Sequence, residues 1–431
     1  MEVFSIAVLL FSFLLLLSLG TPVAWSIIIS SLFTLLVSVP FLPALTTISQ
    51  RMATGIDSFA LLAIPFFILS GELMNKGGVA HRLVAFAKAL VGFLPGGLAL
   101  INVISAMLMG SVAGSAMASA SAMGSILGPE MEKEGYSKGF GVAINITSAT
   151  TGLVIPPSNI LIVYSLASGG ASIAALFLAG YIPGILTGLF LMAVAMIWAK
   201  KKNFKTGKRA PLKTVFSSFV RAFPSLMLLF VVIGGIVSGV FTATEASAIA
   251  VIYTLVLGFV YKEITFKTLP TILLKSSTTT AIVMFLIGAS MSMSWVLSYE
   301  NIPEMISSGI LSLSDNKIVI LLLINFTLLF VGIFMDMTPA VLIFTPIFLP
   351  IVTQLGIDPV HFGIIMILNL CIGLCTPPVG SVLFVGVGVA NTSIQKVIKP
   401  LIPLFLAMIV ALLLVTYIPA LSLWLPSIFD L

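Results

Sequence analysis

Adjacent prolines interrupt two strongly apolar segments of this chain. The first pair lies in GLVIPPSN (residues 152–159) and the second in GLCTPPVG (residues 373–380). Proline lacks a backbone N–H and its ring clashes with the preceding turn, so two prolines in a row break a helix. The residue before a proline is also driven out of the α region. The chain is therefore predicted to break a buried helix in the same way at two places.

Apolar stretches near the ~20 residues needed to cross a bilayer recur along the whole length. Of the 431 residues, 59% are hydrophobic and only 8% are charged, whereas a soluble domain carries about 25% charged residues. The composition predicts an all-α polytopic membrane protein. The first apolar stretch follows Glu2 and no basic residue, so it is predicted to be a transmembrane helix rather than a cleaved signal peptide.

Basic residues orient the predicted helices. Seven of the twenty Lys and Arg residues lie in the loop 200–213, which marks this loop as cytoplasmic. They are Lys200, Lys201, Lys202, Lys205, Lys208, Arg209 and Lys213. With this loop inside, segment 97–129, broken at GSVAGS (110–115), is predicted to be a re-entrant hairpin, because Arg82 and Lys88 then stay in the cytoplasm.

The second half is threaded by the same argument. Lys262, Lys267 and Lys275 are assigned to a cytoplasmic turn. Segment 317–352, broken at GIFMDMTP (332–339), is predicted to be a second re-entrant hairpin that enters from outside. A last helix is predicted over residues 400–425.

An internal repeat relates the two halves. Pro377 minus Pro156 gives an offset of 221 residues, and several other pairs keep it. These pairs are Pro129 and Pro350, Gly135 and Gly356, Gly152 and Gly373, and Pro157 and Pro378, while Gly110 matches Gly332 with one residue of slippage. Inverted repeats with discontinuous helices are typical of secondary transporters, whose binding site lies where the breaks meet.

A broken helix in hydrocarbon needs partners for its free backbone groups. The break exposes carbonyls at one half-helix end and N–H groups with a positive dipole at the other. Carbonyls can hold a cation such as Na⁺, and N–H groups can hold a substrate carboxylate. The alternative is a pair of proline kinks that neighbouring helices satisfy.

Side chains near the breaks add candidate ligands. Ser111 and Ser115 lie at the predicted tip of the first hairpin. Asp336 is the only ionisable residue in the apolar stretch 318–357. An acid within a membrane costs at least ~2.5 kcal/mol on insertion scales, which makes it a functional candidate; the alternative role is to cap the second arm of its hairpin.

Other polar residues are assigned more modest roles. Asn159, Thr338 and Thr376 offer side-chain oxygens beside the breaks. Glu72 and Glu245 are predicted to be interfacial or capping, and Cys371 and Cys375 to be small packing residues. Arg51 is predicted to be solvated, with attraction of a carboxylate as the alternative. No P-loop, HExxH or GxSxG motif is present, so the chain is predicted not to be an enzyme or an ATP-driven pump, and its charge of +6 is no signal for nucleic acid.

Several motifs together resemble the large membrane subunit of TRAP transporters, the tripartite ATP-independent periplasmic transporters of bacteria and archaea. They are GIDSFALLAIPFFILSGELMNKGG (55–78), FLPGGLALINVISAMLMGSVAGSA (93–116), VIPPSN (154–159), GGIVSGVFTATEASAIAVIYTLVLG (234–258) and LCTPPVGSVLFV (374–385). The resemblance runs along nearly the whole chain.

The resemblance implies an importer of organic acids in the bacterial inner membrane, coupled to a sodium gradient and without another cofactor. A periplasmic binding protein would deliver the carboxylated solute, and a small four-helix membrane subunit would complete the unit. Some family members fuse that subunit to the large one, whereas this chain begins with large-subunit sequence, so a separate subunit is expected. Sialic acid is favoured over a C4-dicarboxylate as substrate.

An elevator-type movement of a transport domain against a scaffold is also implied. The corresponding segments are scaffold helices 1–92, a first transport repeat 93–183, scaffold helices 184–315 with the basic loop, a second and inverted transport repeat 316–399, and a C-terminal helix 400–431.

The family's sites are carried over to matching positions. The first sodium site would use Gly110, Ser111, Gly114, Thr151, Gly152, Pro157 and Asn159. The second would use Gly332, Asp336, Thr338, Gly373, Thr376 and Pro378. The substrate would lie near Ser115 and Asp336, with Arg51 as a further candidate. A channel-like pore and a membrane enzyme are the alternatives from other classes; a pore would need rings of like charge or a repeated carbonyl filter.

Overall fold

The computed structural model describes residues 2–202, 204, 209–313 and 316–431, and every regular element in these residues is a helix. Among them, eight helices are long and apolar enough to cross a membrane. The prediction of an all-α polytopic membrane protein is confirmed. The first apolar stretch forms helix α1 (Glu2–Ser18).

The first predicted hairpin consists of α6 (Gly97–Ala113) and α7 (Ala116–Lys133). The chain turns at Gly114, whose φ of 59° lies in the left-handed region that glycine adopts without a Cβ penalty. Ser115 is the N-cap of α7, and its Oγ accepts a hydrogen bond of 3.2 Å from the Ala118 N–H. The helix break predicted within 110–115 is therefore present. Gly114 ends α6, and Ser115 caps the start of α7.

The first Pro-Pro pair separates α8 (Lys138–Thr151) from α9 (Asn159–Ala167). The second pair separates α17 (Pro359–Gly373) from α18 (Ser381–Val389). The peptide bond between the two prolines is cis in both segments. Both predicted helix breaks are thus present.

The second hairpin consists of α15 (Lys317–Phe334) and α16 (Met337–Gln354). Each half of the chain therefore has the same order of a helical hairpin, a short polar turn and a broken helix. The core of the protein lies at the first halves of the broken helices, because nearly every residue of α8 and α17 is buried. The two helices differ in composition, because α17 is largely apolar whereas α8 also buries Asn145, Thr147, Ser148, Thr150 and Thr151.

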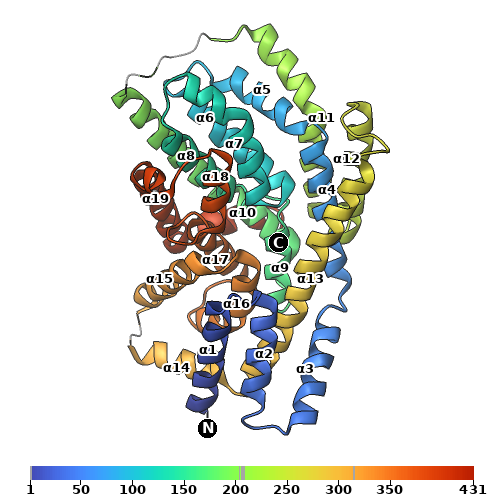
Figure 1. Ribbon diagram of the computed structural model, residues 1–431, viewed down its shortest axis with the longest axis vertical. Helices are drawn as coiled ribbons and strands as arrows, with labels where there is room; N and C mark the ends of the chain where they lie inside the picture. Colours follow the sequence, from blue (N-terminus) through green and yellow to red (C-terminus); the bar gives the residue numbers. More distant parts are fainter. Residues whose placement is uncertain (1, 203, 205–208, 314–315) are drawn as a thin grey trace.

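The two repeats exchange their second half-helices. The first halves stay within their own repeat, since α8 packs on α6 and α17 packs on α15. The second halves cross over, since α9 packs on α16 and α18 packs on α7. In Figure 1, α18 accordingly lies beside α7 in the upper half and α9 lies near α16 in the lower half. This exchange joins the two repeats into one packed body.

The breaks also touch each other through side chains. Cys371 Sγ donates a hydrogen bond of 3.0 Å to the Thr150 carbonyl, and Cys375 Sγ lies 3.1 Å from Thr150 Oγ1. Both cysteines are free and buried. Their predicted packing role is confirmed, and it lies at the contact between α8 and α17.

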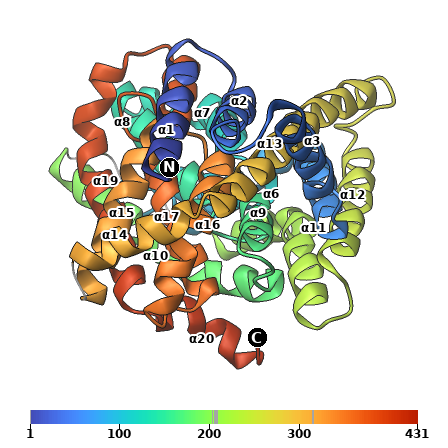
Figure 2. The same ribbon diagram turned by 90° about the horizontal axis from the view of Figure 1, so that it is seen from below.

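The remaining helices surround this body. Before the first hairpin these are α2 (Val23–Leu35), α3 (Phe41–Gly55), the 3₁₀ turn η1 (Phe59–Leu62), α4 (Ala63–Lys76) and α5 (Val79–Val91). Between the repeats they are α10 (Ile173–Lys201), α11 (Leu212–Val237), α12 (Ala243–Val260), α13 (Leu269–Tyr299) and α14 (Ile302–Leu313). Figures 1 and 2 both show α3, α11 and α12 on one side of the molecule and α15 and α19 on the other.

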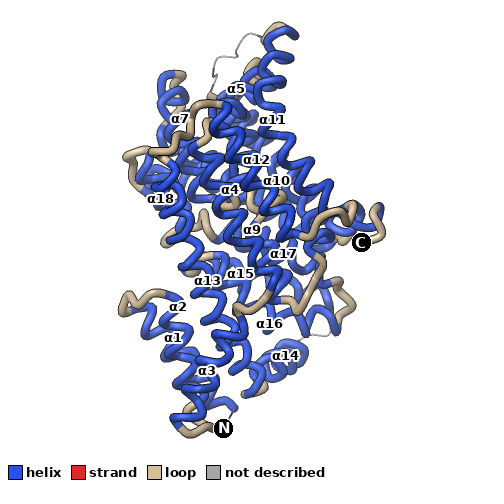
Figure 3. Tube along the Cα trace, turned by 90° about the vertical axis from the view of Figure 1, so that its right-hand side faces the viewer, coloured by secondary structure: helices blue, strands red, loops and turns tan. Residues whose placement is uncertain are grey.

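Helices α4 and α13 lie between these two sides. They pack on each other and on α12, α2 or α3, and they also contact α9 and α16 of the repeats. Figure 3 shows α5 and α11 toward one end of the molecule and α1, α3 and α14 toward the other. The basic residues of α5 thus share an end with the loop predicted to be cytoplasmic.

The last predicted helix, 400–425, is wrong in its extent. The chain instead forms α19 (Ile394–Tyr417) and α20 (Ala420–Ile428). Ile418 precedes Pro419 and has left the α region, with φ −121° and ψ 84°, as expected for a residue before proline. Two boundaries of the predicted segments, 183/184 and 399/400, fall inside α10 and α19, which continue through them.

The basic loop is shorter than predicted. Lys200 and Lys201 form the last turn of α10, and Lys213 lies in the first turn of α11. Cations at a helix C-terminus are favoured by the helix dipole, so the first two lysines extend α10. Lys205 and Lys208 lie outside the described residues.

Candidate functional site

A cavity of about 540 Å³ lies where both hairpin tips meet the start of α9. We call it the tip cavity. Helices α4 and α13 also line it, as do Leu153, Leu374 and Val382 of the two broken segments. Five residues predicted for the sodium or substrate sites line it: Gly114, Ser115, Asn159, Asp336 and Thr338. The structure thus brings together residues that are far apart in the sequence.

The first hairpin tip reaches the cavity because Gly114 has no side chain. A Cβ on Gly114 would lie 2.8 Å from Asn159 Nδ2, closer than a carbon atom can approach without displacing that amide. Asn159 is the first residue of α9, so the hairpin tip and the restart of the broken helix are in direct contact. Ser115 follows at the N-cap of α7, and its side chain also lines the cavity.

The second hairpin tip contributes a carboxylate. Asp336 occupies the N-cap position of α16, with extended backbone (φ −71°, ψ 162°), and its side chain is exposed to the cavity. Thr338 lies in the first turn of the same helix and lines the cavity too. Asp336 thus occupies the helix-capping position that was the alternative to a ligand role. The same position places its carboxylate on the cavity wall.

Two glycine contacts hold the hairpins against the breaks. A Cβ on Gly152 would lie 2.9 Å from the Gly110 Cα, and a Cβ on Gly373 would lie 2.6 Å from the Gly332 Cα. These are matching positions of the two repeats. Only glycine allows such an approach of backbones, which is how small residues act between membrane helices.

The hydroxyl groups predicted for the sodium sites are buried or half-buried against their own helices. Ser111 Oγ donates to the Leu108 carbonyl (2.9 Å), Thr151 Oγ1 to the Thr147 carbonyl (2.7 Å) and Thr376 Oγ1 to the Ile372 carbonyl (2.7 Å). In each case the hydroxyl proton is used within the helix. The oxygen lone pairs remain able to accept a hydrogen bond or to bind a cation.

Each break holds a serine oxygen that sequence reasoning missed. Ser158 Oγ, at the N-cap of α9, and Ser381 Oγ, on the first residue of α18, are buried and have no hydrogen-bond partner among the described residues. Ser158 is the first residue after one Pro-Pro pair, and Ser381 is the third residue after the other. This closeness to the prolines is the sequence signal by which they could have been found. A buried polar atom without a partner is costly, so a ligand at each break would satisfy these oxygens.

Arg51 is not brought to the tip cavity. It lies on α3, where its guanidinium stacks over the Trp295 ring at 4.9 Å from the centroid. The side chain is exposed, as the solvated alternative expects. The structure supplies no contact between Arg51 and the other predicted site residues.

Two charged residues of the cavity wall were assigned elsewhere by the sequence. Glu72, predicted to be interfacial or capping, instead forms an ion pair with Lys275, with Nζ 2.8 Å from Oε1. Both residues line the tip cavity, and Lys275 lies within α13 rather than in a turn. For Glu245 the capping prediction is confirmed, because its side chain and that of Thr242 form a reciprocal capping box at the start of α12.

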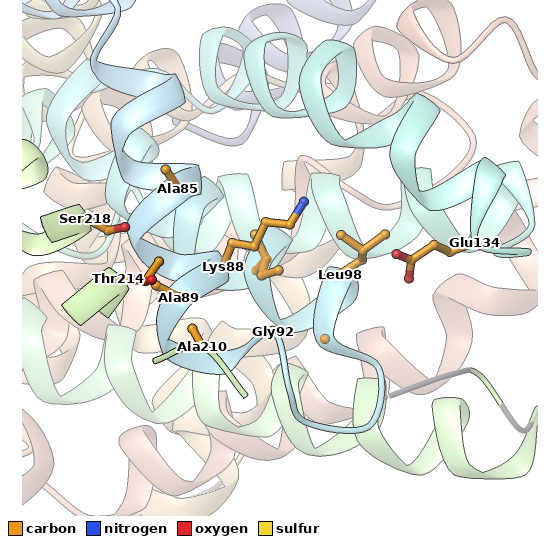
Figure 4. A pocket seen from close by; sticks show the side chains of 11 residues that line it. Ala85, Lys88, Ala89, Gly92, Leu98, Glu134, Ala210, Thr214 and Ser218 are labelled. Atoms are coloured by element: carbon orange, nitrogen blue, oxygen red, sulfur yellow. The ribbon is translucent and has the colours of Figure 1, made fainter. Parts of the chain in front are cut away.

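Another pocket, of about 360 Å³, lies between α5, α6 and α11. Figure 4 shows Lys88 and Glu134 on its wall, with Thr214 and Ser218 of α11 beside α5. None of the residues predicted for sodium or substrate lines this pocket. The tip cavity is therefore the better candidate for the functional site.

Comparison with known proteins gives a consistent result. Residues 10–421 match the family model described as "Tripartite ATP-independent periplasmic transporter, DctM component". The Salmonella typhimurium protein YgiK is 56% identical, over 99% of this chain and 98% of YgiK.

Two further relatives carry substrate names. The C4-dicarboxylate TRAP transporter large permease protein DctM of Pseudomonas aeruginosa is 41% identical, over 86% of this chain and 87% of that protein. The sialic acid TRAP transporter large permease protein SiaM of Vibrio cholerae is 38% identical, over 97% and 98%.

Among solved structures, the Alcanivorax borkumensis YdaH transporter has a similar fold. The TM-score is 0.65, and the match covers 91% of this chain and 90% of that one. The sequences are only 14% identical, so the likeness concerns the fold alone.

Proposed function

Because this chain belongs to the TRAP transporter family as its DctM component, we propose that it is the large membrane subunit of a sodium-coupled importer for a carboxylated organic solute. The observation that carries the proposal is the tip cavity, where two hairpins and a broken helix bring polar groups to one place. Relatives are named as transporter permeases, which favours transport over catalysis. The proposed location is the bacterial inner membrane.

The solute would enter the tip cavity between Ser115 and Asp336. The first turns of α7, α9 and α16 line this cavity, and a helix N-terminus attracts an anion. Sialic acid is the proposed substrate, and a C4-dicarboxylate is the second candidate. Relatives named for the two substrates have 38% and 41% identity to this chain. Because these identities are similar, an uptake experiment has to distinguish the two substrates.

Sodium would be held at the two breaks. The residues there fit a small hard cation, since each break combines unwound backbone with a buried serine oxygen that lacks a partner. Ser158 with Ser111, Thr151 and Asn159 would serve the first site. Ser381 with Thr376, Thr338 and Asp336 would serve the second. Bound there, sodium would neutralise charge at the breaks and would couple uptake to its own gradient.

The interlocked repeats would move as one body against the other helices. The exchange of α9 and α18 between repeats makes independent movement of either repeat costly in buried contacts, which supports an elevator-type movement. A small membrane subunit as a separate chain and a periplasmic binding protein are the proposed partners, in keeping with the tripartite system that the family description names.

Uptake of radiolabelled solute into proteoliposomes tests the proposal. The liposomes carry this chain with its small subunit, and the binding protein and solute are supplied outside. We expect saturable uptake of sialic acid that requires both an inward sodium gradient and the binding protein. Uptake of a C4-dicarboxylate instead would correct the substrate, whereas non-saturating flux without a gradient would favour a pore.

Substitution of Ser158 and Ser381, which we call the orphan serines because their buried hydroxyls have no hydrogen-bond partner among the described residues, tests the sodium sites. Ser158→Ala and Ser381→Ala are each expected to raise the half-saturating sodium concentration about tenfold, which corresponds to ~1.4 kcal/mol for one lost ligand oxygen. Ser290→Ala is the matched control, because Ser290 Oγ is also buried without a partner among the described residues but belongs to α13 and not to either broken segment. An unchanged sodium dependence in both test variants would contradict the assignment.

A further inference from the structure

An ion pair lies on the wall of the tip cavity, and neither of its residues belongs to the hairpins or the broken helices. Lys275 Nζ on α13 lies 2.8 Å from Oε1 and 2.9 Å from Oε2 of Glu72 on α4. Both residues line the cavity together with the residues of the two hairpin tips. The pair therefore faces the place where we propose that the solute binds.

The two partners differ in their freedom to move. The Glu72 side chain is only 13% exposed, whereas the Lys275 side chain is 54% exposed. A lysine carries its ammonium on a flexible four-carbon stem. Lys275 can therefore leave Glu72 and reach into the cavity, while the carboxylate stays in place.

Lys275 differs in charge from the other ionisable residues of the cavity wall. Among the residues that line the cavity, the ionisable ones are Glu72, Asp336 and Lys275. Lys275 is thus the one cation that an entering anion would meet among these lining residues, against two carboxylates. An acid group placed beside two carboxylates without a cation would be strongly disfavoured.

We propose that Lys275 binds the acid group of the transported solute, and that Glu72 holds the Lys275 ammonium until the solute displaces it. This inference rests on the proposed function and names the residue that would select an anionic solute. The exchange leaves the ammonium paired in both states, first with Glu72 and then with the solute. Asn75 and Thr279 lie on the same wall and line the cavity, so further polar groups are available to a bound acid.

A purely structural role makes a different prediction. If the pair only clamps α4 to α13, then reversing its charges should preserve the clamp. The double variant Glu72→Lys/Lys275→Glu keeps an ion pair at this contact but places the ammonium on α4. It would therefore restore a structural clamp and would not restore an anion site at Lys275.

The experiment compares Lys275→Met, Glu72→Gln and the charge-reversed double variant with the unmodified chain, each with the small subunit. Initial uptake is measured against the concentration of solute-loaded binding protein. Sialic acid binding to the purified subunits is measured by the rise in thermal unfolding temperature. Lys138→Met is the matched control, since Lys138 also pairs with a glutamate, Glu132 at 3.6 Å, but does not line the tip cavity.

We expect Lys275→Met to lower the maximal uptake rate and the affinity for sialic acid roughly 10- to 100-fold, as for the loss of a charged hydrogen-bond partner. The half-saturating concentration of loaded binding protein should stay unchanged, because the proposed role of Lys275 is to bind the solute and not the binding protein. Glu72→Gln should bind the anion at least as tightly as the unmodified chain, and the charge-reversed variant should resemble Lys275→Met.

Restored uptake in the charge-reversed variant, or unchanged uptake in Lys275→Met, would overturn the inference and leave the transport function intact. Equal losses of anion binding in Lys275→Met and Glu72→Gln, each with a lower unfolding temperature, would also overturn it in favour of the clamp. If the unmodified chain carries no anion under any gradient, the proposed function itself fails, and the inference fails with it.

Discussion

Replacing Asp336 by asparagine is expected to reduce sodium-driven uptake by at least ~100-fold, the effect of losing a charged ligand worth about 3 kcal/mol. Asp336 is the carboxylate that the second hairpin tip presents to the tip cavity. Asparagine keeps the size and a carbonyl oxygen, so the loss isolates the charge. Uptake measured over a range of sodium concentrations checks this result, and the half-saturating concentration should rise with the loss of rate.

Asp358→Asn provides the matched control. Asp358 is also an acid at a helix N-cap, where its Oδ1 accepts hydrogen bonds from the N–H groups of Val360 (2.7 Å) and His361 (3.4 Å) at the start of α17. Asparagine caps helices about as well as aspartate, so uptake should stay near that of the unmodified chain. Uptake near that of the unmodified chain in Asp336→Asn would mean that Asp336 acts as a helix cap and not through its charge. Equal losses in both variants would mean that the effect is not specific to the carboxylate on the cavity wall.

The breaks in the helices could be predicted because proline and glycine act locally. Pro156, Pro157 and their counterparts remove N–H groups and distort the preceding turn whatever surrounds them. Gly114 marks the first hairpin tip in the same way. The repeat offset then showed which breaks correspond, and the structure places the corresponding glycines in equivalent contacts.

Contacts between distant segments could not be predicted in this way. The exchange of α9 and α18 between the repeats follows from how apolar faces pack, and helices that are apolar on every side carry little directional pattern. For the same reason the sequence offered no means of pairing Glu72 with Lys275, which are 203 residues apart.

The orphan serines show a different limit. Ser158 and Ser381 are common residues in positions that would suit a capping role. What distinguishes them is that neither hydroxyl has a hydrogen-bond partner among the described residues. That property depends on packing around the break. Charge rules placed Lys275 in a cytoplasmic turn for a related reason, because they count basic residues without regard to the direction of a side chain.

The glycine contacts between hairpins and breaks set how closely the site can be assembled. In the second repeat, a Cβ on Gly373 would lie 2.6 Å from both the Cα and the carbonyl carbon of Gly332. These are backbone atoms, which cannot rotate away as a side chain can. In the first repeat, a Cβ on Gly152 would lie 2.7 Å from the Met107 carbonyl oxygen. Relief in either place requires that a hairpin arm move away from its broken helix.

Gly373→Ala is therefore expected to destabilise the protein by about 2–3 kcal/mol, as overpacking does, and to abolish most uptake because α15 is pushed from α17. The unfolding temperature of the purified subunit and its uptake rate check both effects. Gly388→Ala in α18 is the control, since a Cβ there would meet no atom within 4 Å and alanine favours a helix over glycine. Its unfolding temperature should be unchanged or higher. If Gly373→Ala kept the stability and uptake of the unmodified chain, the close approach of Gly332 and Gly373 would have no part in holding the second break.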